Sequence, residues 1–112
     1  MKFFTACILT LLVARIQAQP YQTVFESSHG AETPTYPQII QWWSALSKNA
    51  PNIQMKVMGM TDAGMPLHLV TISGGKEFGY NQNHKKGKVV ILINNGIHPG
   101  EPDGIDASML LA

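Results

Sequence analysis

The sequence predicts an α/β chain, in which helices and strands alternate along 112 residues. Three observations lead to this fold class. Apolar residues recur at helical spacing between Thr35 and Asn49. Two stretches that alternate between apolar and polar residues, 55–61 and 67–73, flank a turn and predict a β-hairpin. An unbroken apolar run, 89–93, then suits a strand buried on both faces, and a further helix is predicted after it.

Residues 1–18 have the pattern of a secretory signal peptide. Lys2 gives a positive start, the apolar run Phe3–Val13 follows, and the small residue Ala18 suits cleavage directly after it. The apolar run is shorter than the roughly 20 residues that a membrane-spanning helix needs. We therefore expect an exported protein, secreted or periplasmic, with no membrane anchor in its mature form.

Removal of this segment changes the composition of the chain. Lys2 and Arg15 leave with it, so six basic residues remain against seven acidic ones. This balance gives no electrostatic support for nucleic-acid binding. Cys7, the only cysteine, is also lost, so no disulfide is expected in the mature chain. Arg15 is the sole arginine, and no guanidinium remains to hold a carboxylate at two points.

The domain itself is expected over residues 35–112. Residues 19–34 are mostly polar and predict an extended lead-in. Thr35 is a suitable cap for the first helix, Pro37 is tolerated in the first turn, and Pro51 marks the end of the helix.

Turn-forming residues, Asp62–Pro66, join the two predicted hairpin strands. His68 alternates within the second of these strands, which predicts a half-buried or cross-strand histidine. Residues 74–88 are rich in glycine, asparagine and lysine and predict a surface loop. The buried strand is then expected over residues 88–94.

The last predicted element is a helix that begins near Pro102. Proline suits the first helical position, and Asp103 and Asp106 favour a helix N-terminus electrostatically. Apolar residues continue to accumulate up to Ala112, and no residue that typically ends a helix follows them. We therefore expect the sequence to be truncated inside this helix.

His98 and Glu101, on the turn that follows the apolar run, are candidate zinc ligands. A catalytic zinc commonly takes three protein ligands, with imidazole and carboxylate groups among them, and keeps a position for water. The same spacing occurs at His29 and Glu32, which lie in a polar stretch with no element to orient them. Around His98, glycines allow a tight turn and Pro102 restricts the backbone of Glu101. The residues alone leave two interpretations open: a pair of zinc ligands, or a hydrogen-bonded loop histidine beside a solvated glutamate.

Several segments, in this order, resemble the N-terminal part of the zinc carboxypeptidase (metallocarboxypeptidase) family. Thr35–Pro51 resembles the opening helix of that family, Met58–Ser73 resembles its first hairpin, and Asn95–Glu101 resembles its first zinc-binding segment. The resemblance implies a mixed, mostly parallel sheet flanked by helices, present here as an incomplete domain. It also implies that the candidate histidine and glutamate bind zinc.

The activity implied by the resemblance is zinc-dependent hydrolysis of C-terminal peptide bonds in peptides or proteins. In that mechanism zinc polarises the scissile carbonyl and lowers the pKa of bound water to about 7, while a glutamate acts as general base. Arginines hold the terminal carboxylate of the substrate. The third zinc ligand, the base and the arginines are all expected beyond Ala112. The chain by itself is therefore expected to be inactive.

Two other functions stay open at this point. Zinc amidohydrolases of the aspartoacylase type share a His-x-x-Glu turn after a strand, although the export signal and the opening helix argue against them. A non-catalytic binding module would keep the fold without the chemistry. The sequence indicates neither the preferred substrate residue nor the oligomeric state.

Overall fold

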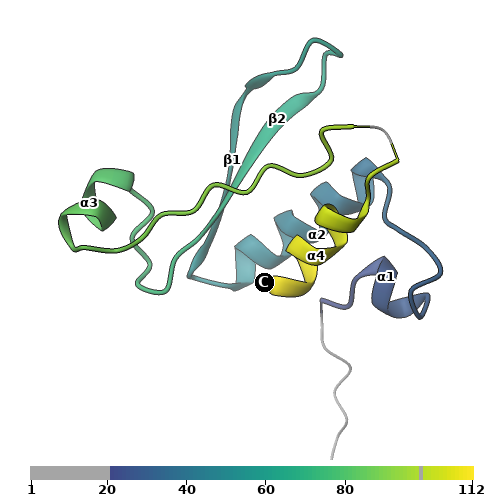
Figure 1. Ribbon diagram of the computed structural model, residues 1–112, viewed down its shortest axis with the longest axis horizontal. Coiled ribbons are helices and arrows are strands. Elements are labelled where there is room, and N and C mark those ends of the chain that lie inside the picture. The colour runs from purple at the N-terminus through teal and green to yellow at the C-terminus, as the bar shows by residue number, and fades with distance from the viewer. Residues whose placement is uncertain (1–20, 99) are drawn as a thin grey trace, which may run out of the picture.

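The computed structural model describes residues 21–98 and 100–112, and the predicted signal peptide lies outside them. Helices and strands follow one another as an α/β arrangement (Figure 1), with the order α1 (Val24–Ser27), α2 (Tyr36–Asn49), β1 (Ile53–Met60), β2 (Pro66–Ile72), α3 (Tyr80–Lys85) and α4 (Asp103–Leu111). Among these residues, no helix combines the length and the apolar character needed to cross a bilayer.

The predicted first helix is confirmed as α2. The backbone nitrogen and the hydroxyl of Thr35 each donate a hydrogen bond of 2.7 Å to the side-chain oxygen of Gln38, which closes the helix N-terminus. Pro37 lies in the first turn, as predicted. The helix ends at Asn49, and the N–H of the capping residue Ala50 donates to the carbonyl oxygen of Leu46 at 2.8 Å.

The predicted hairpin is also confirmed. Strands β1 and β2 pair antiparallel from Ile53 opposite Ile72 to Met60 opposite Pro66, with a shift in register between Val57 and Gly59. This hairpin is the only sheet in residues 21–98 and 100–112. The parallel part of the expected sheet is therefore not represented in this part of the chain.

A small apolar core joins α2, the hairpin and α4. Its buried members are Trp43 and Leu46 of α2, Ile53 of β1 and Met109 of α4, each between 3% and 8% exposed. Ile105 packs against this cluster from the first half of α4. The position of α4, and of the turn that precedes it, thus depends on contacts with α2 and β1.

The lead-in is not extended throughout, so that prediction was wrong for part of the segment. Val24–Ser27 forms the short helix α1, because Thr23 and Glu26 cap it reciprocally. The Thr23 hydroxyl oxygen accepts from the Glu26 amide at 3.1 Å, and the Glu26 carboxylate accepts from the Thr23 amide at 2.8 Å. A threonine followed three residues later by glutamate is the sequence signature of this motif.

The predicted surface loop at 74–88 contains the short helix α3. Glu77, which precedes this helix, forms ion pairs with Lys86 and Lys88, which follow it, so the two ends of the loop are joined. Inside this loop, Asn83 is buried and its side-chain nitrogen donates to the carbonyl oxygens of Glu77 and Gly79 at 2.9 and 3.0 Å.

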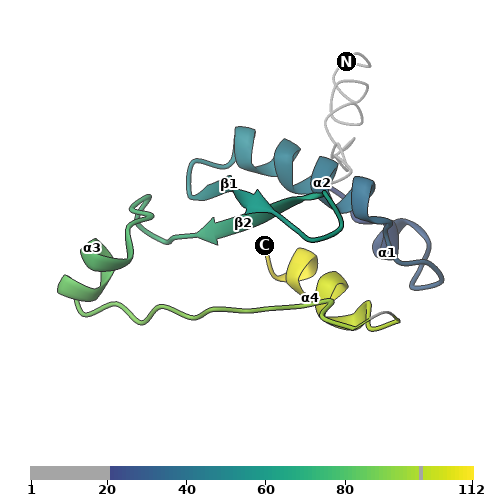
Figure 2. The same cartoon turned by 90° about the horizontal axis from the view of Figure 1, so that it is seen from above.

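The predicted strand at 88–94 is wrong for the described chain. The segment is extended, but it forms no strand ladder, and Val89, Ile91 and Leu92 are 76% to 86% exposed. Figure 2 shows it running by itself from α3 to α4. An unbroken apolar run predicts burial by neighbours on both faces. Residues 21–98 and 100–112 supply no such neighbours, because β1 and β2 pair only with each other.

Candidate metal centre

The turn that carries His98 and Glu101 connects the extended segment to α4. Gly96 and Gly100 have positive φ angles of 66° and 84°, which glycine adopts without strain. A Cβ atom added at Gly96 would lie 2.8 Å from Cδ1 of Ile105, so the turn lies directly against α4. The glycines predicted to allow a tight turn do so in the structure.

The side chains of His98 and Glu101 face each other across this turn. Nδ1 of His98 lies 3.1 Å from Oε2 and 3.2 Å from Oε1 of Glu101. The two side chains are 72% and 62% exposed. An exposed pair of this kind contributes at most about 1 kcal/mol to stability. The arrangement therefore has little value as a purely structural ion pair.

The pair fits a zinc ion. Two ligand atoms about 2.1 Å from one zinc lie ~3.4 Å apart when the angle between them is tetrahedral. The observed separations differ from this value by only a few tenths of an ångström, and one nitrogen faces both carboxylate oxygens. With no ion present, the same contact is an ordinary hydrogen bond, in which the Nδ1–H tautomer of His98 donates to Glu101. Neutral imidazole and carboxylate are both common zinc ligands.

Among the described residues, His98 is the only histidine paired with a carboxylate. No third His, Cys, Asp or Glu side chain of the described residues joins this pair, and no other group of three could hold a metal there. His29 adopts a positive φ of 55° after α1, and the amide of Glu32 donates to the Ser28 hydroxyl. His68 is half-buried opposite Val57, as predicted for a cross-strand histidine.

The helix after the turn is confirmed as α4, and its first helical residue is Asp103. Pro102 was predicted at the first helical position, but it is the capping residue directly before the helix, which therefore begins one residue later than predicted. Asp106 was predicted only as a helix-start residue, but it is 6% exposed and its Oδ1 has no hydrogen-bond partner among the described residues. A buried carboxylate oxygen normally has a partner. Burial of this side chain had no signal in the sequence.

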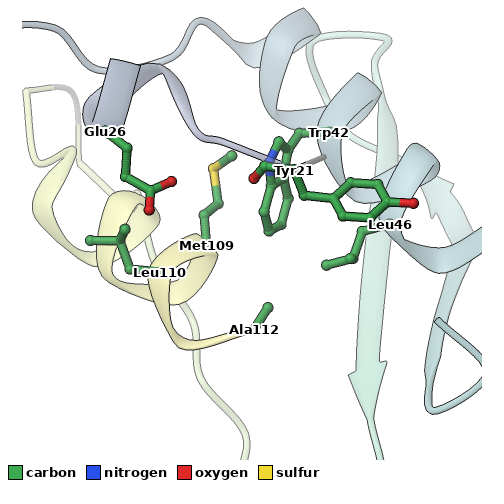
Figure 3. A pocket seen from close by; sticks show the side chains of 7 residues that line it. All are labelled: Tyr21, Glu26, Trp42, Leu46, Met109, Leu110 and Ala112. Atoms are coloured by element: carbon green, nitrogen blue, oxygen red, sulfur yellow. The ribbon is translucent and has the colours of Figure 1, made fainter. Parts of the chain in front are cut away.

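A hollow of about 200 Å³ lies between α1, α2 and α4 (Figure 3). It is lined by Tyr21, Glu26, Trp42, Leu46, Met109, Leu110 and Ala112. The only carboxylate in it, that of Glu26, already accepts hydrogen bonds from Thr23. Neither His98 nor Glu101 lines this hollow, so it is separate from the candidate metal centre.

Comparison with known proteins identifies the class. A model of the zinc carboxypeptidase family matches residues 39–112, which is 74 of the 112 residues. The matched range includes α2 from Ile39 onward, the hairpin, both candidate ligands and α4. The chain belongs to the zinc carboxypeptidase family. Neither the curated proteins nor the solved structures yielded a match.

Proposed function

We propose that this chain is part of an exported zinc carboxypeptidase, which removes residues from the C-terminal ends of peptides or proteins. One observation carries the proposal: in a chain of this family, Nδ1 of His98 faces both carboxylate oxygens of Glu101 at 3.1 and 3.2 Å. A histidine nitrogen and a carboxylate oxygen that converge in this way can supply two of the three protein ligands of a catalytic zinc.

In this proposal His98 and Glu101 hold the metal. Zinc bound there supplies Lewis-acid polarisation of the scissile carbonyl and a bound water of pKa about 7. His98 and Glu101 are exposed side chains on a turn, so a zinc ion held by them would be open to water and substrate. The close approach of Gly96 to Ile105 places the turn that carries them against α4.

The remaining groups are proposed to come from other parts of the protein. A catalytic zinc takes three protein ligands, and in residues 21–98 and 100–112 no third His, Cys, Asp or Glu joins His98 and Glu101. A general base and an arginine that binds the substrate carboxylate are also needed. Arg15 is the only arginine of the sequence, and it lies in the proposed signal peptide. We assign residues 35–112 to the N-terminal portion of the catalytic domain.

Export is the second part of the proposal. The positive start, the apolar run and Ala18 support cleavage before Gln19. N-terminal sequencing of the protein recovered outside the cytoplasm is expected to begin at Gln19. Recovery of the protein with Met1 intact in the cytoplasm would contradict export.

The reaction is tested with the full-length protein, loaded with zinc and given three substrates in parallel. These are a peptide with a free C-terminal carboxylate, the same peptide amidated at its C-terminus, and an N-acyl amino acid. We expect release of the last residue from the free peptide only, because arginine recognition needs the carboxylate.

Two other results would overturn this proposal and indicate a different function. Hydrolysis of the N-acyl amino acid without cleavage of the peptide would indicate an amidohydrolase. Saturable binding of the free peptide, with no hydrolysis of any substrate by zinc-loaded protein, would indicate a binding module.

A further inference from the structure

The turn that carries His98 and Glu101 is hydrogen-bonded to α4 through the side chain of Asn95. The side-chain nitrogen of Asn95 donates a hydrogen bond to the hydroxyl of Ser108. That hydroxyl donates in turn to the carbonyl oxygen of Gly104 at 2.7 Å. A serine hydroxyl has one hydrogen, so it donates to the carbonyl and accepts from the amide. The hydrogen bonds therefore run in one direction, from Asn95 through Ser108 to the backbone of α4.

The residue at position 104 leaves room for this contact. A Cβ atom added at Gly104 would lie 2.6 Å from Oδ1 and 2.9 Å from Cγ of Asn95. The amide of Asn95 thus lies against the bare backbone of α4, at the same turn whose carbonyl Ser108 engages. Any side chain at position 104 would displace it.

The contact brackets the metal ligands. Asn95 precedes His98 by three residues, and Gly104 follows Glu101 by three residues. Both ligands therefore lie on a short loop whose two ends are held together through Ser108. Fixing the ends of a loop removes conformations in which its side chains lie apart. A metal site requires its ligands within about 0.5 Å of their productive positions.

We propose that Asn95 is a positioning residue for the metal centre, acting with Ser108 and Gly104 as a latch that holds His98 and Glu101 in ligand geometry. This role rests on the proposed function, because it concerns the same zinc site. The side-chain hydrogen bond of Asn95 goes to Ser108 and not to His98 or Glu101. The effect of Asn95 on the ligands is proposed to come from the position it gives to the loop. Its side chain is exposed, so it contributes little to the buried core.

The experiment measures the zinc dissociation constant of the full-length protein by competition with a chromophoric chelator. Asn95→Ala and Ser108→Ala are each expected to weaken zinc binding about tenfold, the range typical of groups that orient metal ligands. The double variant is expected to be no weaker than either single one, because both substitutions break the same hydrogen bond. Ser108→Thr keeps the hydroxyl and should restore the affinity. Asn94→Ala is the matched control, as it removes the neighbouring exposed amide.

Gly104→Ala tests the close approach of the Asn95 amide to the backbone of α4, rather than the hydrogen bond between Asn95 and Ser108. It should weaken zinc binding in the native background, because its Cβ meets the Asn95 amide. In the Asn95→Ala background, Oδ1 and Cγ are gone and only the Cβ remains, 3.3 Å from the added atom, so the same substitution should have a much smaller further effect. If Gly104→Ala reduced the zinc affinity by the same factor in both backgrounds, the positioning role of Asn95 would be overturned.

A readout without metal separates this proposal from the proposed function. In the zinc-free protein, amides of the loop at 96–103 should exchange with deuterium faster in Asn95→Ala than in Asn94→Ala. Zinc affinity within twofold of the native value, together with unchanged exchange, would overturn the latch and leave the proposed function standing. Failure of the native protein to bind zinc would overturn the proposed function, and the positioning role with it.

Discussion

The indole nitrogen of Trp42 donates a hydrogen bond of 2.7 Å to the backbone carbonyl oxygen of Tyr21. The bond joins the lead-in to α2 across 21 residues of sequence. Trp42 also packs edge to face on Trp43, with ring centroids 4.9 Å apart. The lead-in is thereby attached to the helix that carries two of the four buried core residues, Trp43 and Leu46.

Replacement of Trp42 by phenylalanine should therefore destabilise the full-length protein. The substitution keeps an aromatic ring but removes the donor, and a hydrogen bond of this kind contributes about 1 kcal/mol. Urea unfolding should show a lower midpoint with an unchanged slope. Tyr21→Phe is the control, because the acceptor is a backbone atom that this change leaves in place. Equal stability of Trp42→Phe and native protein would count against the attachment.

Met109 is the residue through which α4 contributes to the core. It is 3% exposed, whereas its neighbour Leu110 is 49% exposed. We expect Met109→Ala to cost about 2 to 5 kcal/mol in the free energy of unfolding, the range for large-to-small substitutions in cores. Leu110→Ala should cost much less in the same measurement. If the two substitutions had equal effects, the docking of α4 on α2 would be wrong.

The loop around α3 should loosen in acid. Lys86 and then Lys88, through hydrogen bonds to the carboxylate, lower the pKa of Glu77 below its ordinary value of 4.5. A lowered pKa in the folded state stabilises the loop above the unfolded pKa, and this stabilisation is lost as the pH falls through the folded value. Hydrogen exchange at 76–88 should therefore rise below about pH 4.5, beyond the intrinsic change in rate. The Glu77→Gln variant should exchange faster at neutral pH and lack this added rise. If the exchange rates of the native protein and the variant changed in parallel with pH, the ion pairs of Glu77 would be excluded as the cause of the rise.

The parts of the fold that could be predicted from the sequence are those determined locally. Thr35, Pro37 and Pro51 delimit α2 through capping and backbone restriction, and the hairpin follows from alternation around Asp62–Pro66. The short helix α1 carried a usable signal in Thr23 and Glu26 that was missed.

The predicted strand at 88–94 failed for a different reason. A run such as Val89–Ile93 shows that burial is favourable, but it does not show which segment provides it. Strand pairing is a property of the partner as well as of the strand.

At the candidate site, the spacing and the setting on a turn predict His98 and Glu101 as ligands, and the structure brings their side chains together. Their binding of zinc stays a prediction. The spacing alone was ambiguous, since His29 and Glu32 share it without coming together in the structure. The contact of Asn95 with Ser108 joins residues 13 apart and depends on how the turn lies on α4, so no local pattern indicates it.

The 112-residue chain produced by itself should not hydrolyse peptides. It has the two proposed ligands, His98 and Glu101, with no third His, Cys, Asp or Glu beside them among the described residues, and no arginine outside the predicted signal peptide. Loss of a direct ligand should weaken zinc binding by more than the ~10- to 100-fold that loss of an outer partner costs. Calorimetric titration of this chain and of the full-length protein measures the difference. Equal zinc affinity in the two would show that the centre is complete without further residues.

The central claim is that His98 and Glu101 bind zinc, and metal analysis of the full-length protein tests it most directly. Native protein, His98→Ala, Glu101→Ala and the spacing control His29→Ala are each dialysed against a weak chelator and analysed for zinc by mass spectrometry. We predict equimolar zinc in the native protein and in His29→Ala, and a loss of most of the zinc in the other two variants. Full zinc retention in His98→Ala and Glu101→Ala would contradict the claim.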